Sequence, residues 1–533
     1  MSLISSIPAS PPGALLRTGF NATRSQASPL ARLMPSSIVT LGSPAESASL
    51  YTAQRTALPK EAAQAVDVAS LLSLNVSSGS TAGRFSGLGA ALLGQLNSEE
   101  YSANEGAKIN FSAGAGSAQG VDAAGSAGAV FHGAGDERIA LAITTASGVQ
   151  VSLTLDSRPD GLALQMTSSA ALSDAERSAL AGLAGAFQDA IDGFSQQPPK
   201  VKLDGLTQFD PTLLASVDLH AVVKLDAASS ATQTLDFRAD GAERKVSLNG
   251  PAGIATMRVD TSKLAAVGSA GRQAAAVDSY LKQIDQATGR GHGDAGLMAM
   301  FKDAFAGMHS HIGQAQTGAG WAQASKVQLG PEDHAAMSGL ADFSASVTQT
   351  SMAVNPMRPA EQDSFAYQVS QNTSVSGASQ ADRSISQQQK SALQATYHTP
   401  AVPGTALNLT QDAQSQNYNY HQIDDRASSD ISLRYQNGLL ASASLLQSAT
   451  QSARQMQYAL GKLVSDKVTP GQHTVTRDLM SALGPYQGMD AGRTEEQRSE
   501  QRKLFLESLS GQVLLQAYPN AVGGVAPGEV AAG

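Results

Sequence analysis

Hydrophobic and polar residues alternate over a long central part of the chain, and this period of two predicts β-strands that bury one face. The alternation begins at Ile139, and turn residues such as Ser147-Gly148 interrupt it. The interruptions divide the stretch into three predicted strands. Their apolar positions are Ile139, Leu141 and Ile143, then Val149, Val151, Leu153 and Leu155, then Leu162, Leu164 and Met166.

A helix is predicted directly after these strands. Ser173 and Glu176 have the spacing of a capping box, which marks where a helix begins. Apolar residues then recur at the spacing that places them along one side of a helix. They are Leu180, Leu183, Phe187, Ile191 and Phe194. Residues 137–196 therefore predict three strands followed by one helix.

Residues 215–287 show the same order of alternating strands followed by a helix, which we place at 270–286. A further helix is predicted over 297–312. The eight residues that begin at Thr154 match those that begin at Thr234 at six of eight positions. Two interpretations stay open: an internal duplication of a sheet-plus-helix module, or a recurrence of common Asp-Gly turns.

Residues 340–452 form a second alternating region, in which Ser, Thr, Gln and Asn take polar positions that charged residues usually occupy. Asn437-Gly438 stands between two alternating runs and is a strong signal for a two-residue hairpin. Long polar strands with thin apolar faces predict an extended antiparallel sheet. Such a sheet needs a packing partner elsewhere on this chain or on another.

The two ends of the chain differ from these sheets. Seven prolines interrupt residues 1–60, which predicts a disordered leader. Residues 61–135 are rich in Gly, Ala and Ser, and they predict a linker with short helices at 62–74 and 88–96. Near the other end, residues 453–483 are expected to be helical in part. A second capping box at Thr494 and Gln497 begins a final helix that Pro519 ends.

The predicted fold class is α+β, with an antiparallel sheet-plus-helix module, an extended polar antiparallel β region and C-terminal helices. We divide the chain into a disordered acid-poor leader (1–60), a linker with short helices (61–135), an α+β module in which a duplication is one interpretation (136–315), a second linker (316–339), the extended β region (340–452), C-terminal helices (453–519) and a disordered tail (520–533).

Composition excludes several classes of function. The chain has 533 residues, no cysteine and a net charge of −9. Without cysteine it has no disulfide framework, no thiolate nucleophile and no thiolate metal site. The acidic balance argues against a broad nucleic-acid interface, which needs a clustered basic face. No apolar run of about 18 residues occurs, so no transmembrane helix is predicted.

The leader is the part of the chain that bears on location. Glu46 is the first acidic residue, and three arginines but no lysine precede it. Acid-poor N-termini rich in Arg and Ser are typical of signals that an export or import machine reads, although this one lacks the apolar core of a secretory signal. Three interpretations stay open: a signal for an exporter of another kind, a disordered arm, or an arm whose apolar run at 38–41 docks as an extra strand.

The glycine pairs at 87/89, 114/116 and 133/135 resemble fragments of a dinucleotide-binding loop. None of them continues as G-x-G-x-x-G, and none follows a buried strand in an alternating β-α pattern. A linker or turn role is therefore favoured. The chain also contains neither a G-x-S-x-G elbow nor a phosphate-binding G-x-x-x-x-G-K-[ST] loop.

Three groups of polar residues are candidates for chemistry, and a surface or structural role is favoured for each. His309 and His311 with His292 lack the i, i+4 spacing of a zinc helix. Two aspartates per loop fall short of the six or so oxygen ligands of calcium. These loop aspartates are Asp156 with Asp160 and Asp236 with Asp240. The densest cluster comprises Tyr418, Tyr420, His421, Asp424, Asp425 and Arg426.

On a strand, Tyr418 and Tyr420 would share one face while His421 faces away. An acid–base pair of His421 with either aspartate would therefore need a rearrangement. We assign no catalytic, cofactor-binding or metal-binding residue and expect no cofactor.

Three segments resemble a group of uncharacterised proteins from gamma-proteobacteria, many of them in pseudomonads. They are SSIVTL at 36–41, GRFSGLGAALL at 83–93 and ISLRYQNG at 431–438. Members of the group sometimes carry a lactate dehydrogenase label. The residues here do not support an NAD-dependent dehydrogenase, because the nucleotide fingerprint and the parallel α/β pattern are missing. The resemblance implies no catalytic residue.

These observations favour a non-enzymatic interaction or structural protein that is exported or surface-associated by a route without a cleaved secretory signal. A secreted effector or enzyme of unknown chemistry and a cytoplasmic scaffold are the alternatives. We expect a protein partner or self-assembly, no nucleic acid and no transmembrane segment.

Overall fold

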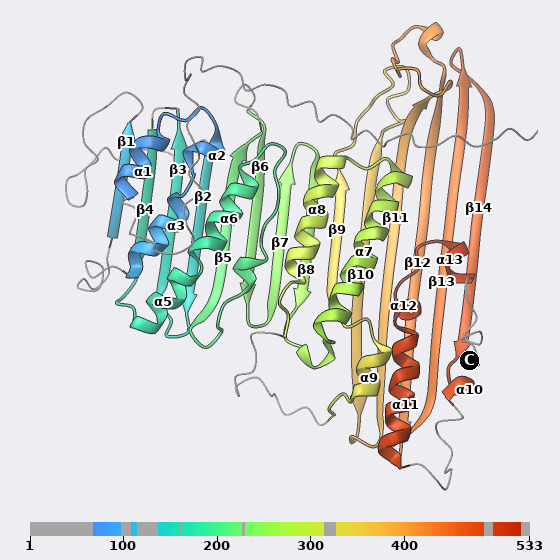
Figure 1. Cartoon of the computed structure of the whole chain (residues 1–533). Coiled ribbons are helices and arrows are strands. Elements are labelled where there is room, and N and C mark those ends of the chain that lie inside the picture. The colour runs from blue at the N-terminus through green and yellow to red at the C-terminus, as the bar shows by residue number, and fades with distance from the viewer. Residues whose placement is uncertain are drawn as a thin grey trace, which may run out of the picture. The chain divides into compact units, whose positions relative to one another are not determined.

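Fourteen β-strands of the described chain form one antiparallel sheet in the computed structural model (Figure 1). The structure describes residues 68–97, 108–114, 137–159, 161–225, 230–313, 327–483 and 494–523. The strand order across the sheet is β1-β4-β3-β2-β5-β6-β7-β8-β9-β10-β11-β12-β13-β14. From β5 onward each strand lies beside its neighbours in sequence, so most of the sheet is a meander.

The strands lengthen along the sheet, from 7–11 residues in β1 to β9 to 14–21 residues in β10 to β14. Their bounds are β1 Lys108–Gly114, β2 Glu137–Thr145, β3 Gln150–Arg158, β4 Gly161–Ser168, β5 Leu214–Lys224, β6 Thr232–Asp240, β7 Glu243–Gly250, β8 Gly253–Asp260, β9 Phe343–Gln349, β10 Ser364–Gly377, β11 Arg383–Pro400, β12 Tyr418–Gln436, β13 Leu439–Ala459 and β14 Lys462–Asp478.

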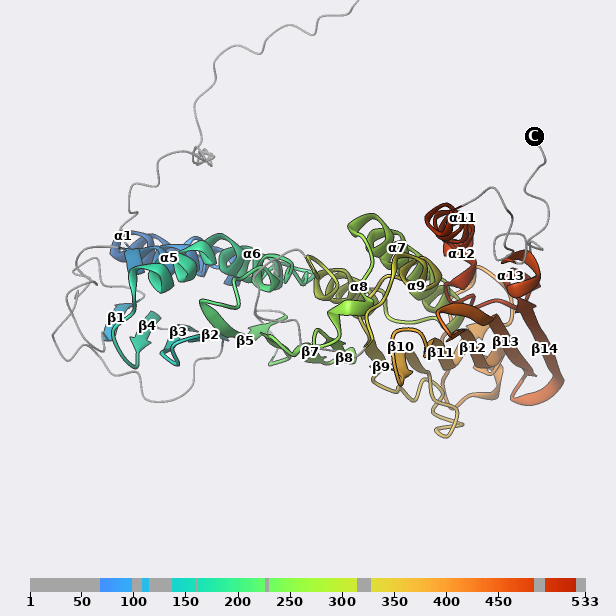
Figure 2. The same cartoon turned by 90° about the horizontal axis from the view of Figure 1, so that it is seen from below.

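The helices labelled in Figure 2 all lie on one side of this sheet. Helices α7 and α8 are the longest of the central ones and pack on β7 to β9 and β11. The helix bounds are α1 Val68–Asn75, α2 Thr81–Arg84, α3 Leu88–Gly94, α5 Asp174–Gly182, α6 Ala184–Phe194, α7 Ala270–Gly291, α8 Ala295–Met308, α9 Pro331–Ala336, α10 Met480–Leu483, α11 Glu495–Ser508, α12 Ser510–Val513 and α13 Pro519–Gly523.

The alternation in the sequence decides which face of the sheet the helices cover. In β2, Ile139, Leu141 and Ile143 point towards the helices and are buried, whereas Ala140 and Ala142 point to the other side. The same division holds along the sheet, and one apolar cluster runs under the helices from Phe111 in β1 to β13. Burial of this face is the main source of stability, because removing apolar area from water is favourable.

The α+β fold class is confirmed, and so are several local predictions. Both capping boxes are present, at Ser173 for α5 and at Thr494 for α11. The predicted hairpin joins β12 to β13, and Asn437 and Gly438 both have positive φ, at 51° and 79°. These are the left-handed conformations that a two-residue hairpin turn of this type needs.

The two β regions meet in a way that the sequence left open. The region from 340 onward neither packs over the central module nor projects from it. It continues the same sheet edge to edge, because β8 pairs with β9 and places Met257 opposite Ala345. Within the expected linker 316–339, the structure also places the short helix α9.

The expectation that residues 453–483 are partly helical is wrong for most of the segment. Strand β13 continues to Ala459, and β14 follows it along the whole edge of the sheet. Helix α10 is confined to four residues. The segment lacks the apolar stripe of a helix, and the side chains of β14 are mostly exposed on both faces, as an edge strand allows. Pro470 lies within β14, where a missing N–H is tolerated because one side of an edge strand is unpaired.

Two further differences concern the linker and the C-terminal helix. Residues 108–114, expected in a linker, form strand β1 beside β4, whereas the short helices of that linker are present as α1 and α3. The final helix divides into α11 and α12. Pro519 begins α13, a position that suits proline because the first turn needs no N–H donor.

The remaining expectations fall on residues that the structure does not describe. They concern the acid-poor leader, the later part of the Gly-rich linker and most of the C-terminal tail. The repeated segments at Thr154 and Thr234 both lie where a strand enters a hairpin, in β3 and β6. The duplication itself stays a prediction.

Candidate binding surface

The glycine pair at 87/89 serves helix packing. Gly87 has a φ of 73° and precedes the first residue of α3. Gly89 lies against α6, where a β-carbon would come within 2.5 Å of Ile191 Cδ1 and 2.9 Å of Phe187. A side chain at this position would therefore push α3 away from α6. Of the other two pairs, the structure describes only Gly114, at the end of β1.

The three candidate histidines do not converge. His292 ends α7 and stacks on Tyr397, with ring centroids 3.9 Å apart. His309 is buried beside Phe305 and Phe343, and this burial lowers its pKa to about 4, so the ring is neutral. His311 follows the turn after α8. Across the described ranges, no three His, Asp or Glu side chains are placed to hold a metal ion.

The polar cluster in β12 is divided between the two faces of the sheet. As expected, Tyr418 and Tyr420 share one face, and His421 faces away. Asp425 lies on the helix side and forms an ion pair with Arg290 of α7. His421 stacks on Tyr397 on that side, and desolvation lowers its pKa. Because Asp424 and Arg426 lie on the other face, the six residues form no common site.

Tyr418 and Tyr458 help to hold two loops over one end of the sheet face opposite the helices. Glu361 accepts hydrogen bonds from Tyr418 at 2.7 Å and Tyr458 at 2.9 Å. His398 Nδ1 lies 2.5 Å from Asp363, and Leu407 and Leu409 pack on the tyrosines. The loops 350–363 and 401–417 therefore cover the ends of β11 to β13 that lie farthest from α9.

The loop aspartates already have partners. Asp156 pairs with Arg138 at 2.6 Å, and Asp236 with His220 at 2.6 Å. Asp240 accepts the backbone N–H groups of residues 242 and 243 and lies 3.3 Å from Arg238. Carboxylates that neighbouring cations and N–H groups neutralise are poor calcium ligands. Asp160 lies outside the described residues.

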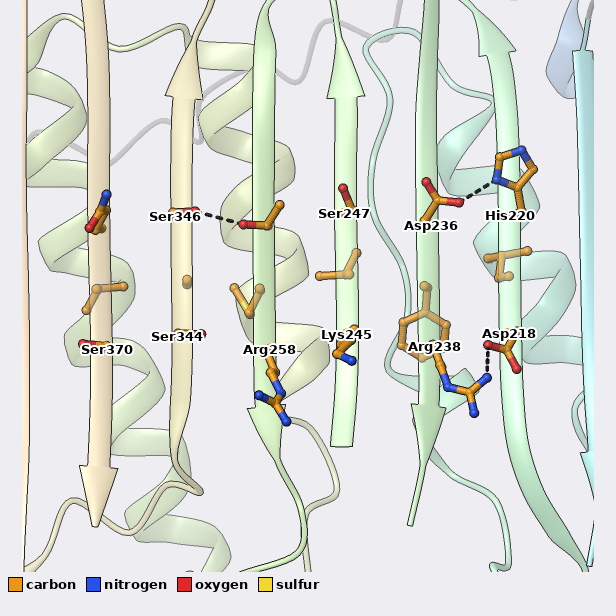
Figure 3. Close-up of a pocket in the computed structure, with 18 of the residues that line it drawn as sticks. Asp218, His220, Asp236, Arg238, Lys245, Ser247, Arg258, Ser344, Ser346 and Ser370 are labelled. Atoms are coloured by element: carbon orange, nitrogen blue, oxygen red, sulfur yellow. Dashed lines mark hydrogen bonds and ion pairs between the residues drawn. The ribbon is translucent and has the colours of Figure 1, made fainter. Parts of the chain in front are cut away.

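The face of the sheet opposite the helices carries a long hollow. Its volume is about 1380 Å³, and it crosses eleven strands, from β3 through β2 and β5 to β13. Within the described part of the chain, no helix covers this area. We call it the trough (Figure 3).

Two rows of side chains, each with one residue per strand, line the trough. Successive members of a row are cross-strand partners in the sheet. The first row is Ser152, Ala142, Asp218, Arg238, Lys245, Arg258, Ser344, Ser370, Lys390, Ser428 and Ser448. The second row is Thr154, Ala140, His220, Asp236, Ser247, Thr256, Ser346, Gln368, Ala392, Arg426 and Thr450.

Three cations stand side by side at the centre of the first row. Arg238, Lys245 and Arg258 occupy directly opposed positions of β6, β7 and β8 (Figure 3). Like charges in such positions repel each other. Asp218 offsets this by pairing with Arg238 at 2.7 Å, and Glu243 pairs with both Lys245 and Arg258.

The cations at the centre of the trough are more exposed than the acids that pair with them. The side chains of Arg238, Lys245 and Arg258 are 48%, 52% and 61% exposed, whereas those of Asp218 and Glu243 are 33% and 15% exposed. Hydrogen bonds from Lys245 and Arg258 lower the pKa of Glu243, so it stays ionised at neutral pH. The positive groups therefore form the outer layer of this part of the trough.

Hydroxyl groups dominate the rest of the trough. Thr256 and Ser346 share a hydrogen bond of 2.9 Å across β8 and β9. Of the ten row positions on β9 to β13, five are serine and one is threonine, and Lys390 and Arg426 are the cations. None of the side chains in the two rows is Phe, Tyr or Trp. The trough can therefore offer hydrogen bonds and positive charge, but no aromatic platform.

The sequence contained a partial signal for the trough. Arg238, Lys245 and Arg258 all occupy polar positions of alternating strands, which places each of them on the face away from the core. That they stand in one row depends on the register of β6, β7 and β8, which the turns between the strands set. The sequence alone therefore does not bring these three cations together.

Comparisons of the chain with protein-family models, with curated proteins and with solved structures found no match. Among the helices that the structure describes, none has both the length and the apolar character needed to span a membrane. Inferences about function therefore rest on the geometry of the molecule.

Proposed function

We propose that this chain is a non-enzymatic interaction or structural protein that uses the trough as its binding surface. The observation that carries the proposal is that ten of eleven neighbouring strands present polar side chains on a face that no helix of the described chain covers, while the opposite face of the same strands is packed. The charged groups of the trough lie mainly on β5 to β8, but polar side chains continue along the rows to β3 on one side and β13 on the other, whereas an active site gathers its polar groups around one reacting atom.

Cysteine reporters can test this proposal cleanly, because the chain has no cysteine of its own. Ser344→Cys places a thiol on the exposed trough face, and Ala275→Cys places one on the exposed surface of α7. Both should react with a maleimide at similar rates in the purified protein. In extracts of the cells that produce the protein, Ser344→Cys should become protected relative to Ala275→Cys. Equal reactivity in the extract would contradict a binding role for the trough.

One observation favours the enzyme alternative. His220 Nδ1 and Asp236 form a hydrogen-bonded pair in the trough, and an aspartate that orients an imidazole is a common arrangement in acid–base catalysis. Ser247 lies on the far side of Asp236 from His220 (Figure 3), so the three do not form a nucleophilic triad. Hydrolysis of a trough ligand that His220→Gln abolishes would replace the interaction proposal with this alternative.

Export remains a separate part of the proposal and is supported by the acid-poor leader and the absence of cysteine. Fusing residues 1–60 to a reporter enzyme tests it. The fusion should leave the cell in an export-competent strain, and a matched fusion with Arg17, Arg24 and Arg32 changed to Gln should stay inside. Retention of both fusions would favour the cytoplasmic scaffold.

A further inference from the structure

The size of the trough points to a polymer as its ligand. Its volume of about 1380 Å³ exceeds that of typical small-molecule pockets, about 300–1,000 Å³. Eleven strands separated by about 4.8 Å give it a length of about 48 Å across the strands. A compact ligand would fill only a fraction of this length.

The regularity of the two rows points to a ligand that repeats along its length. Each step from one strand to the next offers the same two positions, at the same height and about 4.8 Å further on. One sugar unit of an extended polysaccharide covers about one such step. The serine and threonine hydroxyls of the rows can then exchange hydrogen bonds with the sugar hydroxyls, unit by unit.

The charge of the trough selects an acidic ligand. Five lining residues carry a positive charge, and only Asp218 and Asp236 carry a negative one, although the whole chain has a net charge of −9. The five cations are Arg238, Lys245, Arg258, Lys390 and Arg426. At the centre, Asp218 and Glu243 are less exposed than the cations with which they pair, whereas Asp236 pairs with His220 and is 59% exposed. A carboxylate that approaches Arg238, Lys245 or Arg258 from solvent therefore meets guanidinium or ammonium groups first.

Other polymers fit these observations less well. Single-stranded nucleic acids bind by stacking bases on aromatic side chains, and neither row contains a Phe, Tyr or Trp. Peptides that add to a sheet run along an edge strand, and helical peptides need an apolar groove. A second copy of this chain, placed face to face, would set one cation row against another.

We propose that the trough binds an acidic polysaccharide, a carboxylate-bearing glycan chain that lies across the strands. Its acid groups bind Arg238, Lys245 and Arg258, and its hydroxyl groups bind the serine and threonine side chains of both rows. Lys390 provides a further contact for an acid group three strands beyond Arg258. This inference rests on the proposed function, because it names the ligand of the same surface.

Calorimetric titration of the full chain with oligomers of galacturonate about ten units long tests the inference. The wild-type protein should bind them, and rising salt should weaken the binding. Neutral dextran of equal length should bind at least about tenfold more weakly, since it offers no charge-assisted hydrogen bonds. Equal binding of dextran, or tighter binding of polyglutamate or oligo-dT than of the galacturonate oligomer, would overturn the inference.

Substitutions locate the binding. Lys245→Gln with Arg258→Gln should weaken galacturonate binding about tenfold or more, and Lys390→Gln should weaken it by a smaller factor. Lys467→Gln, a matched change on the exposed strand β14 outside the trough, should leave it unchanged. Thermal unfolding checks that each variant is folded, and Lys390 forms no ion pair with another described residue. Equal effects at Lys390 and Lys467 would contradict the assignment to the trough.

The outcome separates this inference from the proposed function. If Ser344→Cys is protected in extracts but galacturonate does not bind, the trough binds a different partner. The glycan proposal then fails, whereas the proposed binding role of the trough stands. If Ser344→Cys stays reactive in extracts and galacturonate does not bind, both proposals fail.

Discussion

The two faces of the sheet are built from the same strands but from different side chains. In β8 and β9, which α8 covers, Met257 and Ala345 are buried, whereas Arg258 and Ser344 directly beside them in sequence face solvent. The covered face contains Phe, Leu, Ile and Val in one large and one smaller cluster, and the trough contains Ser, Thr and Ala with several charged residues. Because apolar burial on the covered face supplies most of the stability, side chains on the trough face can change without unfolding the protein.

The two faces should differ most in their contribution to the free energy of unfolding, and replacing an aromatic core residue should show this. Phe305 of α8 is fully buried, and its ring lies 5.3 Å from that of Phe343 in β9. Phe305→Ala should lower the free energy of unfolding by about 3–5 kcal/mol, because it leaves a cavity. Ser344→Ala, on the trough side of β9, should change it by less than about 0.5 kcal/mol. Equal losses in urea unfolding would show that both faces carry stability.

The buried histidine should make the covered face sensitive to acid. The folded-state pKa of His309 is lowered by desolvation to about 4, from an ordinary value of 6.5. As the pH falls from 6.5 towards 4, His309 binds a proton in the unfolded chain but stays neutral in the folded chain, so the free energy of unfolding falls. The loss attributable to His309 is at most about 3 kcal/mol. His309→Gln should flatten the stability profile in this window, and an unchanged slope would refute the assignment.

Two neighbouring glutamines offer a matched comparison of the faces. Gln389 is buried and bonds Tyr280, the carbonyl of residue 513 and the N–H of residue 515. Gln388 lies on the trough face and bonds Asp430. Gln389→Met should cost about 2–3 kcal/mol, because three buried partners lose a hydrogen bond. Gln388→Met should cost less than about 1 kcal/mol in the same denaturation experiment, and a reversed order would contradict the assignment of faces.

A small effect on stability is also expected at the centre of the trough. Lys245 pairs with Glu243 at the surface, and exposed ion pairs contribute about 0–1 kcal/mol. Lys245→Gln should therefore leave the midpoint of urea unfolding nearly unchanged, although it removes one of three adjacent cations. A loss above about 2 kcal/mol would mean that the cation row serves the fold rather than a ligand.

Much of this fold could be predicted from local patterns. Alternation identified nearly all strands of the sheet, and the capping boxes at Ser173 and Thr494 marked two helix starts. Strand β14 was missed because its side chains are exposed on both faces over most of its length, so burial leaves no pattern there. The edge-to-edge junction of β8 and β9 was also beyond local patterns, since 82 residues separate the two strands.

The candidate site was harder to predict than the fold. A row of side chains across eleven strands depends on the register of ten strand pairs, and a shift of one residue in any pair would move a side chain to the other face. The candidate groups that the sequence did suggest consist of residues that are close in sequence but do not meet in the structure. Tyr420 and His421 are adjacent, but the strand places them on opposite faces.

The central claim is that the trough is open along its whole length, and thiol labelling of the purified full chain tests it most directly. Ser152→Cys, Ser344→Cys and Ser448→Cys place one thiol near each end and one at the middle of the first row. All three should react with a maleimide at rates close to that of a free thiol. Ala345→Cys, which points into the core, should react only as fast as the protein unfolds. If any of the three row positions is as protected as Ala345→Cys, the face is covered in the folded chain, and the trough is not a free binding surface.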